Sequence, residues 1–242
     1  MIHLITYGDN KYKESKKRIY NQAKSLAWFD TITLYSPEDL DEEFKETFKD
    51  ILELPRGGGY WIWKPYIIKK HMDIINDDDI LIYIDAGCYI NPAGVKRFNE
   101  YIEMLNNSDE GCISFQMSQH KEKAWTTKEI FEHFNINNDS DDILETGQIM
   151  ATIKMFKKNA NAVNIVSTWL NALYRNPLVF TDHYNKNNQC EGFIDNRHDQ
   201  SVCSIICKLY KTIVIEDETY FENGFGDEVS LKYPLWATKI RI

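Results

Sequence analysis

The alternation of apolar and polar residues divides the chain into short strands and helices. Strands are predicted where a short apolar or alternating run stops at a glycine, a proline or a polar turn, and helices where apolar residues recur every three or four positions. On this basis, strands are expected at 2–8, 31–36, 77–87, 111–117, 147–156 and 212–218. Helices are expected at 11–29, 37–52, 65–75, 93–105, 126–134, 158–176 and 197–210.

This order of elements predicts the fold class. Strands and helices alternate through the first half of the chain, and the apolar run 80–84 is typical of a strand covered on both faces. Neither an internal repeat nor a Pro/Gly/Ser-rich linker divides the sequence. We therefore predict one α/β, Rossmann-like domain over residues 1–242, with a mixed, mainly parallel central sheet flanked by helices. Ligands of such sheets bind beyond the carboxyl ends of the strands, so Thr6-Tyr7-Gly8 and Asp85-Ala86-Gly87 are expected on one rim.

Composition excludes several classes of function. The 242 residues carry a net charge of −9 and are 43% hydrophobic and 13% aromatic, which favours a folded core and argues against a nucleic-acid-binding surface. No apolar run approaches the ~20 residues of a membrane helix, and no signal peptide is visible. The five cysteines lie mostly in apolar contexts and complete no zinc motif, so we expect buried thiols in a cytoplasmic protein.

Asp85 is the first candidate site residue. It ends the apolar run 80–84 and precedes Ala86 and Gly87, whose small size leaves room for a phosphate or a sugar beside the backbone. A hard divalent cation, Mn²⁺ or Mg²⁺, prefers such oxygen ligands, and substrate phosphates supply others. The alternative is an aspartate that caps a strand-to-turn junction.

Residues 56–65, RGGGYWIWKP, form the second candidate. The three glycines leave the backbone free to wrap a ligand, and Tyr60 with its neighbouring tryptophans offers flat faces for a base or a sugar. Arg56 and Lys64 are candidate phosphate partners because both carry positive charge. A helix that begins near Pro65 adds the dipole of its N-terminus, which favours anions. The alternative is a flexible loop with core aromatics.

The third candidate is the segment 195–202, DNRHDQSV, at a predicted helix start. His198 is a candidate metal ligand, and Asp199 is a candidate partner for a substrate hydroxyl. The alternative makes Asp199 an N-terminal helix cap and His198 a surface residue. The polar loop 182–193 is a candidate lid or acceptor-side loop.

Taken together, these stretches resemble small GT-A-type glycosyltransferases, the sugar-nucleotide-dependent enzymes of bacterial surface-glycan clusters and large DNA viruses. The resemblance covers roughly residues 2–215 and rests on the order and spacing of Thr6-Tyr7-Gly8, RGGGYWIWKPYII, YIDAGC and RHDQSV. In that family an Asp-x-Asp element binds the divalent ion and the ribose-phosphate. This sequence departs from the pattern, because Gly87 stands where the second aspartate is usual.

The resemblance implies transfer of a hexose or deoxyhexose from a nucleoside-diphosphate sugar, a UDP-sugar being favoured, to a glycan or glycolipid hydroxyl. It implies a nucleotide-binding half near residues 1–115 and an acceptor-side half near 116–242. With the residue patterns above, it makes Asp85 and His198 the expected ligands of a divalent cation, and Asp85 and Asp199 the expected catalytic residues. The expected donor-binding residues are Thr6, Tyr7, Arg56, Tyr60, Lys64, Asp85, Ala86 and Gly87.

Two other functions stay open at this point. A nucleotidyltransferase or another sugar-nucleotide-processing enzyme would share a phosphate-and-metal site, and would cleave a nucleoside triphosphate. A degenerate, non-catalytic nucleotide- or glycan-binding module is kept open by Gly87. Ligand binding by such a module would depend neither on Asp85 nor on a metal.

Overall fold

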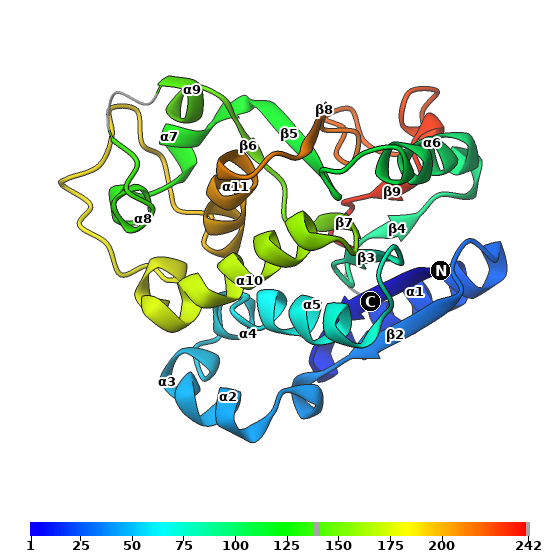
Figure 1. Ribbon diagram of the computed structural model, residues 1–242, viewed down its shortest axis with the longest axis horizontal. Helices are drawn as coiled ribbons and strands as arrows, with labels where there is room; N and C mark the ends of the chain where they lie inside the picture. The colour runs from blue at the N-terminus through cyan, green and yellow to red at the C-terminus, as the bar shows by residue number, and fades with distance from the viewer. Residues whose placement is uncertain (138–140, 241–242) are drawn as a thin grey trace.

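The computed structural model describes residues 1–137 and 141–240, which build an α/β fold around one sheet (Figure 1). The sheet has seven strands in the order β2-β1-β3-β7-β5-β6, with β8 paired to β5. The strands are β1 (Ile2–Tyr7), β2 (Thr31–Tyr35), β3 (Ile80–Ile84), β5 (Cys112–Lys121), β6 (Gly147–Ile149), β7 (Ile153–Lys157) and β8 (Ile213–Glu216). Their pairings make β1, β2, β3, β5 and β8 run in one direction and β6 and β7 in the other. The predicted mixed, mainly parallel sheet is therefore confirmed.

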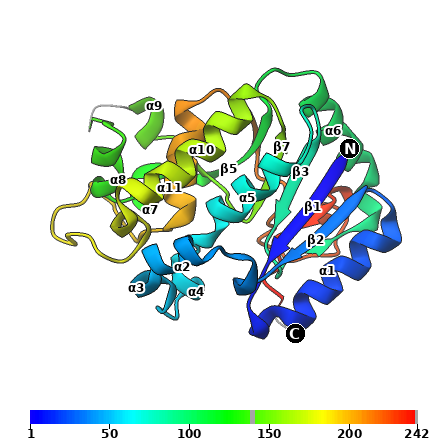
Figure 2. The same ribbon diagram turned by 60° about the horizontal axis from the view of Figure 1, so that its bottom comes forward.

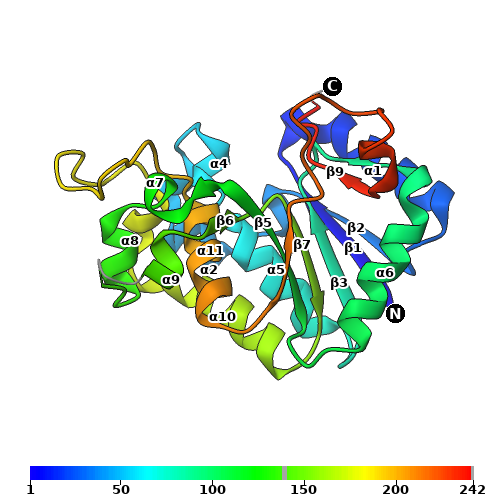
Figure 3. The ribbon, with the colours of Figure 1, turned by 90° about the horizontal axis from the view of Figure 1, so that it is seen from above.

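Helices cover both faces of the sheet (Figure 3). One face carries α5 (Trp63–Ile74), α10 (Ala160–Arg175) and α11 (Asp199–Leu209), which contact one another in turn. The other face carries α1 (Lys13–Leu26), α6 (Val95–Asn106) and a small ribbon of β4 (Tyr89–Ile90) and β9 (Leu235–Trp236). Short helices join these elements: η1 (Asn10–Tyr12), η2 (Pro37–Asp39), α2 (Glu42–Thr47), α3 (Lys49–Leu52), α4 (Gly57–Tyr60), η3 (Pro92–Gly94), α7 (Glu122–Trp125), α8 (Lys128–His133), α9 (Asp141–Leu144), η4 (Pro177–Phe180) and η5 (Ser230–Lys232).

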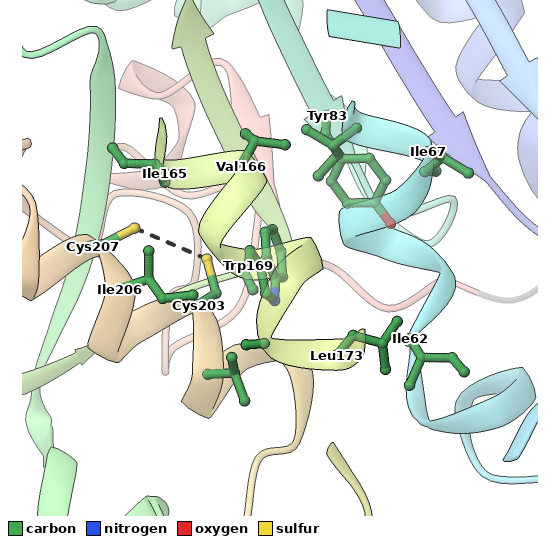
Figure 4. Close-up of a cluster of buried hydrophobic side chains, with 14 of the residues drawn as sticks. Ile62, Ile67, Tyr83, Ile165, Val166, Trp169, Leu173, Cys203, Ile206 and Cys207 are labelled. Carbon is green, nitrogen blue, oxygen red and sulfur yellow. Dashed lines mark hydrogen bonds between the residues drawn. The ribbon is translucent and has the colours of Figure 1, made fainter. Parts of the chain in front are cut away.

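Two hydrophobic clusters follow from this layering. Strand β3 is buried along its whole length: Leu81 and Tyr83 join the cluster under α5 and α10, and Ile82 joins the cluster under α1 and α6. Figure 4 shows Trp169 of α10 in the middle of the first cluster. The unbroken apolar run of β3 is needed because a strand covered on both sides buries every side chain.

The structure corrects the predicted strand 147–156, which is two strands. β6 pairs with β5, whereas β7 pairs with β3 and β5, and the chain changes partner between Met150 and Thr152. The break lets two backbone carbonyl oxygens accept hydrogen bonds from residues predicted for the site. The carbonyl oxygen of Thr152 accepts from Asp85 N, and that of Ala151 accepts from Lys64 Nζ. Hydrophobic periodicity could not reveal it, since the residues on both sides of the break are apolar.

Two further predictions concern the chain as a whole. In the described residues, no helix combines the length and apolar character needed to cross a membrane. The five cysteines are free thiols, and Cys190 alone among them is not buried. The burial of the other four thiols agrees with the expectation from the sequence.

Candidate active site

A cavity of about 920 Å³ lies at the carboxyl ends of β1 and β3. Its walls come from the ends of these strands, from α4 and the start of α5, and from the segment that leads into α11. Eight of the ten residues predicted for the site line it: Tyr7, Arg56, Lys64, Asp85, Ala86, Gly87, His198 and Asp199. Four stretches far apart in the sequence thus meet around one space.

The floor of the cavity is a charge cluster that we call the Lys64 triad, formed by Lys64, Asp85 and Asp199. Lys64 in the first turn of α5 is only 3% exposed, and its Nζ lies 2.9 Å from Asp199 Oδ2 and 3.3 Å from Asp85 Oδ1. Nζ also donates to the carbonyl oxygen of Ala151, and the hydroxyl of Tyr83 donates to Asp85 Oδ1. A buried ammonium is therefore shared between two carboxylates.

The protonation of the triad follows from burial and pairing. Burial by itself lowers the pKa of Lys64, but the carboxylates of Asp199 and Asp85 outweigh it, so the pKa lies above its ordinary value. Burial raises the pKa of Asp199 to about 6, although the Lys64 ammonium acts in the opposite direction. Lys64 thus stays charged at neutral pH, and Asp199 is the member of the triad that exchanges a proton near neutrality.

Aromatic side chains form one wall. The rings of Tyr7 and Trp63 stack with centroids 3.9 Å apart at an angle of 19°. Trp61 and Trp125 also line the cavity, and the guanidinium of Arg197 lies 4.0 Å from the ring centroid of Trp125. Flat aromatic faces beside cationic groups suit a ligand that has both a planar ring and negative charge.

The rim is organised by Asp182, a residue that the sequence analysis did not single out. Its carboxylate accepts from Arg56 Nη1 at 3.1 Å and from the hydroxyl of Tyr60 at 2.8 Å, and its Oδ1 lies 2.8 Å from His198 Nε2. Burial lowers the pKa of His198, and the partnership with Asp182 opposes this shift. Asp182 belongs to the loop 182–193 named above as an acceptor-side candidate, and its location in that polar loop was the one available signal.

Unusual backbone conformations concentrate around the cavity. Tyr60, Trp61, His198 and Lys239 have φ values of 53°, 58°, 56° and 56°, and the last three of them line it. Such conformations cost a non-glycine residue roughly 1–3 kcal/mol each, and they persist where surrounding contacts enforce them. Their concentration here supports a functional role for this region.

Two of the predicted residues lie elsewhere. Thr6 is fully buried and absent from the cavity lining, because alternation along β1 turns it to the face opposite Tyr7. Its Oγ1 has no hydrogen-bond partner in the described part of the chain. Tyr60 points its hydroxyl at Asp182 on the rim and does not line the cavity. A direct contact of Thr6 with a bound base would require a change in the strand.

The residues predicted to hold a metal do not fit that role. One oxygen of Asp85 is engaged by Lys64 and Tyr83, and His198 Nε2 is engaged by Asp182. Within residues 1–137 and 141–240, no three His, Cys, Asp or Glu side chains gather as metal ligands would. The third position of the Asp-x-Asp element is Gly87, and the backbone of Lys239 packs against it. The ammonium of Lys64 already lies beside the carboxylates of Asp85 and Asp199 that a divalent cation would need.

Charge separates the cavity from the rest of the surface. Seven basic residues line it: Lys11, Lys45, Lys49, Arg56, Lys64, Arg197 and Lys239. Five acidic residues line it: Asp9, Glu53, Asp85, Asp195 and Asp199. In a chain of net charge −9, this local excess of positive charge favours an anionic ligand.

No protein-family model matches the sequence, and no curated protein matches it. Among solved structures, the chain is similar to a glycosyltransferase involved in glycosylation of the major capsid of PBCV-1, with 12% identity, a TM-score of 0.47, and 90% of this chain and 83% of that chain covered. It is also similar to the galactosyltransferase LgtC, with 10% identity, a TM-score of 0.45 and coverages of 90% and 75%. A third similar structure is mouse xyloside xylosyltransferase 1, with 10% identity, a TM-score of 0.46, and 98% of this chain and 97% of that chain covered. Likenesses this distant carry no argument about activity, which has to come from the cavity itself.

Proposed function

We propose that the protein is a glycosyltransferase that moves a hexose or deoxyhexose from a nucleoside-diphosphate sugar to a hydroxyl of a glycan or glycolipid. A UDP-sugar is the favoured donor. The observation that carries the proposal is the cavity, which combines an aromatic wall, an excess of positive charge and a floor of two carboxylates around Lys64. A base, a diphosphate and a sugar need these three environments side by side.

The parts of the donor are assigned by chemistry. The stacked pair Tyr7 and Trp63 offers apolar faces to the base or the ribose. The cationic side chains of the lining attract the diphosphate. Hydroxyls of the donor sugar suit the carboxylates of Asp85 and Asp199, which accept hydrogen bonds in the orientation fixed by Lys64. In this proposal Tyr7, Trp63 and Asp85 come from the half near 1–115, and Asp182 and Asp199 come from the half near 116–242.

The transfer step balances with the groups present. In a displacement with inversion, the acceptor oxygen attacks the anomeric carbon, and the bond from that carbon to the β-phosphate oxygen breaks. The electron pair leaves with the nucleoside diphosphate, and the acceptor proton passes to Asp199. A carboxylate with a pKa of about 6 is ionised at neutral pH and suited to general-base work. Because the predicted metal ligands do not fit a cation, no step is assigned to one.

The first test is thermal unfolding with UDP, GDP, dTDP and CMP, for the wild type and Asp85→Asn. A ligand that binds only the folded state raises the midpoint as its concentration exceeds Kd. We expect one nucleoside diphosphate to raise the midpoint in the wild type and to lose most of that effect in Asp85→Asn. The control is Asp73→Asn, because Asp73 pairs with Lys69 on the surface of α5, outside the cavity.

Turnover distinguishes the remaining functions. A transferase releases the same nucleoside diphosphate from the matching sugar nucleotide, slowly with water and faster with a glycan acceptor. Pyrophosphate release from a nucleoside triphosphate would instead favour a nucleotidyltransferase. Nucleotide binding that Asp85→Asn leaves intact, without turnover of any sugar nucleotide, would indicate a non-catalytic module and contradict the proposal.

A further inference from the structure

We infer that the ammonium of Lys239 supplies the positive charge that the donor diphosphate requires, so that donor binding does not depend on a divalent cation. The inference rests on the proposed function and adds to it the source of the counter-charge. It also gives a reason for Gly87, the position at which the sequence departs from the Asp-x-Asp pattern.

The first support is the packing of the chain at Gly87. A Cβ atom built on Gly87 would lie 3.2 Å from Lys239 Cα and 3.5 Å from Ile240 N. Ile240 N and the hydroxyl of Thr238 both donate to the carbonyl oxygen of Gly87. A side chain at position 87 would thus begin in tight contact with the backbone of Lys239 and Ile240. In Figure 2 the red segment at the end of the chain lies near the N-terminal end of α1.

The second support is the state of Lys239 itself. Its side chain is exposed, it lines the cavity, and none of the described carboxylates forms an ion pair with its ammonium. Lys64, by contrast, is already neutralised by Asp85 and Asp199. Lys239 therefore places in the cavity a positive charge that no described carboxylate neutralises.

The third support is the backbone conformation of Lys239. Its φ of 56° lies in the left-handed region that lysine rarely adopts. A glycine or asparagine would fit this conformation with less strain. The two hydrogen bonds to the carbonyl oxygen of Gly87 hold the neighbouring residues and so enforce it. Strain of this kind is found where position matters more than local stability.

A lysine is chemically suited to this work. The bond from the sugar to the diphosphate breaks with its electron pair on the β-phosphate, so negative charge grows there during transfer. An ammonium that lines the cavity stabilises that charge, as a bound cation would. Lysine acts as a compact point charge with three donors, which suits the oxygens of a diphosphate.

The test is calorimetric titration of UDP, GDP and dTDP into the wild type, Lys239→Gln and Lys232→Gln, each in EDTA and in Mn²⁺. Lys232 is the matched control, because it is an exposed lysine of the same C-terminal segment that does not line the cavity. We expect the wild type to bind one nucleoside diphosphate with a Kd that changes less than twofold between EDTA and Mn²⁺. We expect Lys239→Gln to weaken that binding at least tenfold, and Lys232→Gln to leave it unchanged.

Gly87→Ala provides a second variant that keeps the lysine. Its added methyl group meets the backbone of Lys239 at 3.2 Å and displaces it slightly, so we expect binding weaker than in the wild type and stronger than in Lys239→Gln. Binding that appears only with Mn²⁺ would overturn the inference and leave the proposed function intact. Equal binding by the two lysine variants would also overturn it. If none of the nucleoside diphosphates binds in either buffer, the proposed function fails, and the inference with it.

Discussion

Lys64 and Lys154 are both buried lysines, yet they meet opposite surroundings. Lys64 lies between two carboxylates at the floor of the cavity. Lys154 of β7 is fully buried among thiols, with its Nζ 3.3 Å from Cys207 Sγ, and within the described chain no carboxylate pairs with it. Cys203 and Cys207 themselves lie 4.0 Å apart in the hydrophobic cluster of Figure 4.

The difference shows what marks a candidate site. Burial by itself lowers the pKa of each lysine, and neighbouring groups raise it: carboxylates for Lys64, and Cys112, Cys203 and Cys207 for Lys154. The pKa of Cys207 is held low by hydrogen bonds from the other two thiols and by Lys154. Both sites are therefore electrostatically perturbed. Of the two lysines, only Lys64 has partners that line a cavity. Access to a ligand, and not the pKa shift, therefore distinguishes a candidate site from a buried charge of the core.

The largest expected effect is that of Lys64→Met. The change leaves the buried Asp199 and the partly exposed Asp85 without their counter-charge, and removing one partner of a buried pair costs about 3–5 kcal/mol of unfolding free energy. We expect nucleoside-diphosphate binding to fall at least a hundredfold, measured by calorimetry, and stability to fall in urea unfolding at pH 7. Binding retained within threefold would show that the triad does not belong to the donor site.

An intermediate effect is expected on the pH dependence of stability, through the protonation of Asp199. Its folded-state pKa of about 6 lies above the ordinary 3.8, so its contribution to stability is full below pH 4 and is lost as the pH rises to about 6. The shift corresponds to roughly 3 kcal/mol. We expect the free energy of unfolding of Asp199→Asn to lack this decline. Measured by urea unfolding, the stability of the variant relative to the wild type should therefore rise by that amount between pH 4 and pH 7. A constant difference across that range would contradict the raised pKa.

The smallest expected effect on function is that of Lys154→Met. Replacing a buried charge by an apolar side chain of similar length is often neutral or stabilising, and the thiols that remain can be uncharged. We expect nucleotide binding within twofold of the wild type and a stability change of less than about 2 kcal/mol. A loss of binding comparable to that of Lys64→Met would erase the distinction between the two lysines.

Most of the fold could be predicted from hydrophobic periodicity. The runs at 2–8, 31–36 and 77–87 became β1, β2 and β3. β3 is buried along its whole length and so needs continuous apolar residues, whereas β2 lies at the edge of the sheet and is only partly buried. Periodicity could not separate β6 from β7, since the break between them is itself apolar. It also missed β4 and β9, which are two residues long and show no pattern.

The candidate site could be predicted only in part, for a different reason. Residues that follow strand ends or begin helices, such as Asp85 and Asp199, are marked by a polar side chain next to an apolar run. Asp182 and Lys239 have no such local mark, because they reach the cavity through loops whose course depends on the whole fold. The packing of Lys239 against Gly87 could not be predicted locally either, since the two residues lie 152 positions apart in the sequence.

The contact between Gly87 and residues 238–240 also sets an order of events during synthesis. A ribosome that adds roughly 5–20 residues each second needs about 8 to 30 s to proceed from one side of this contact to the other. During that interval the nascent chain holds Tyr7, Lys64 and Asp85, and it lacks the lysine that completes the cavity. Until residues 238–240 have been made, the carbonyl oxygen of Gly87 lacks the two hydrogen bonds that this segment donates to it.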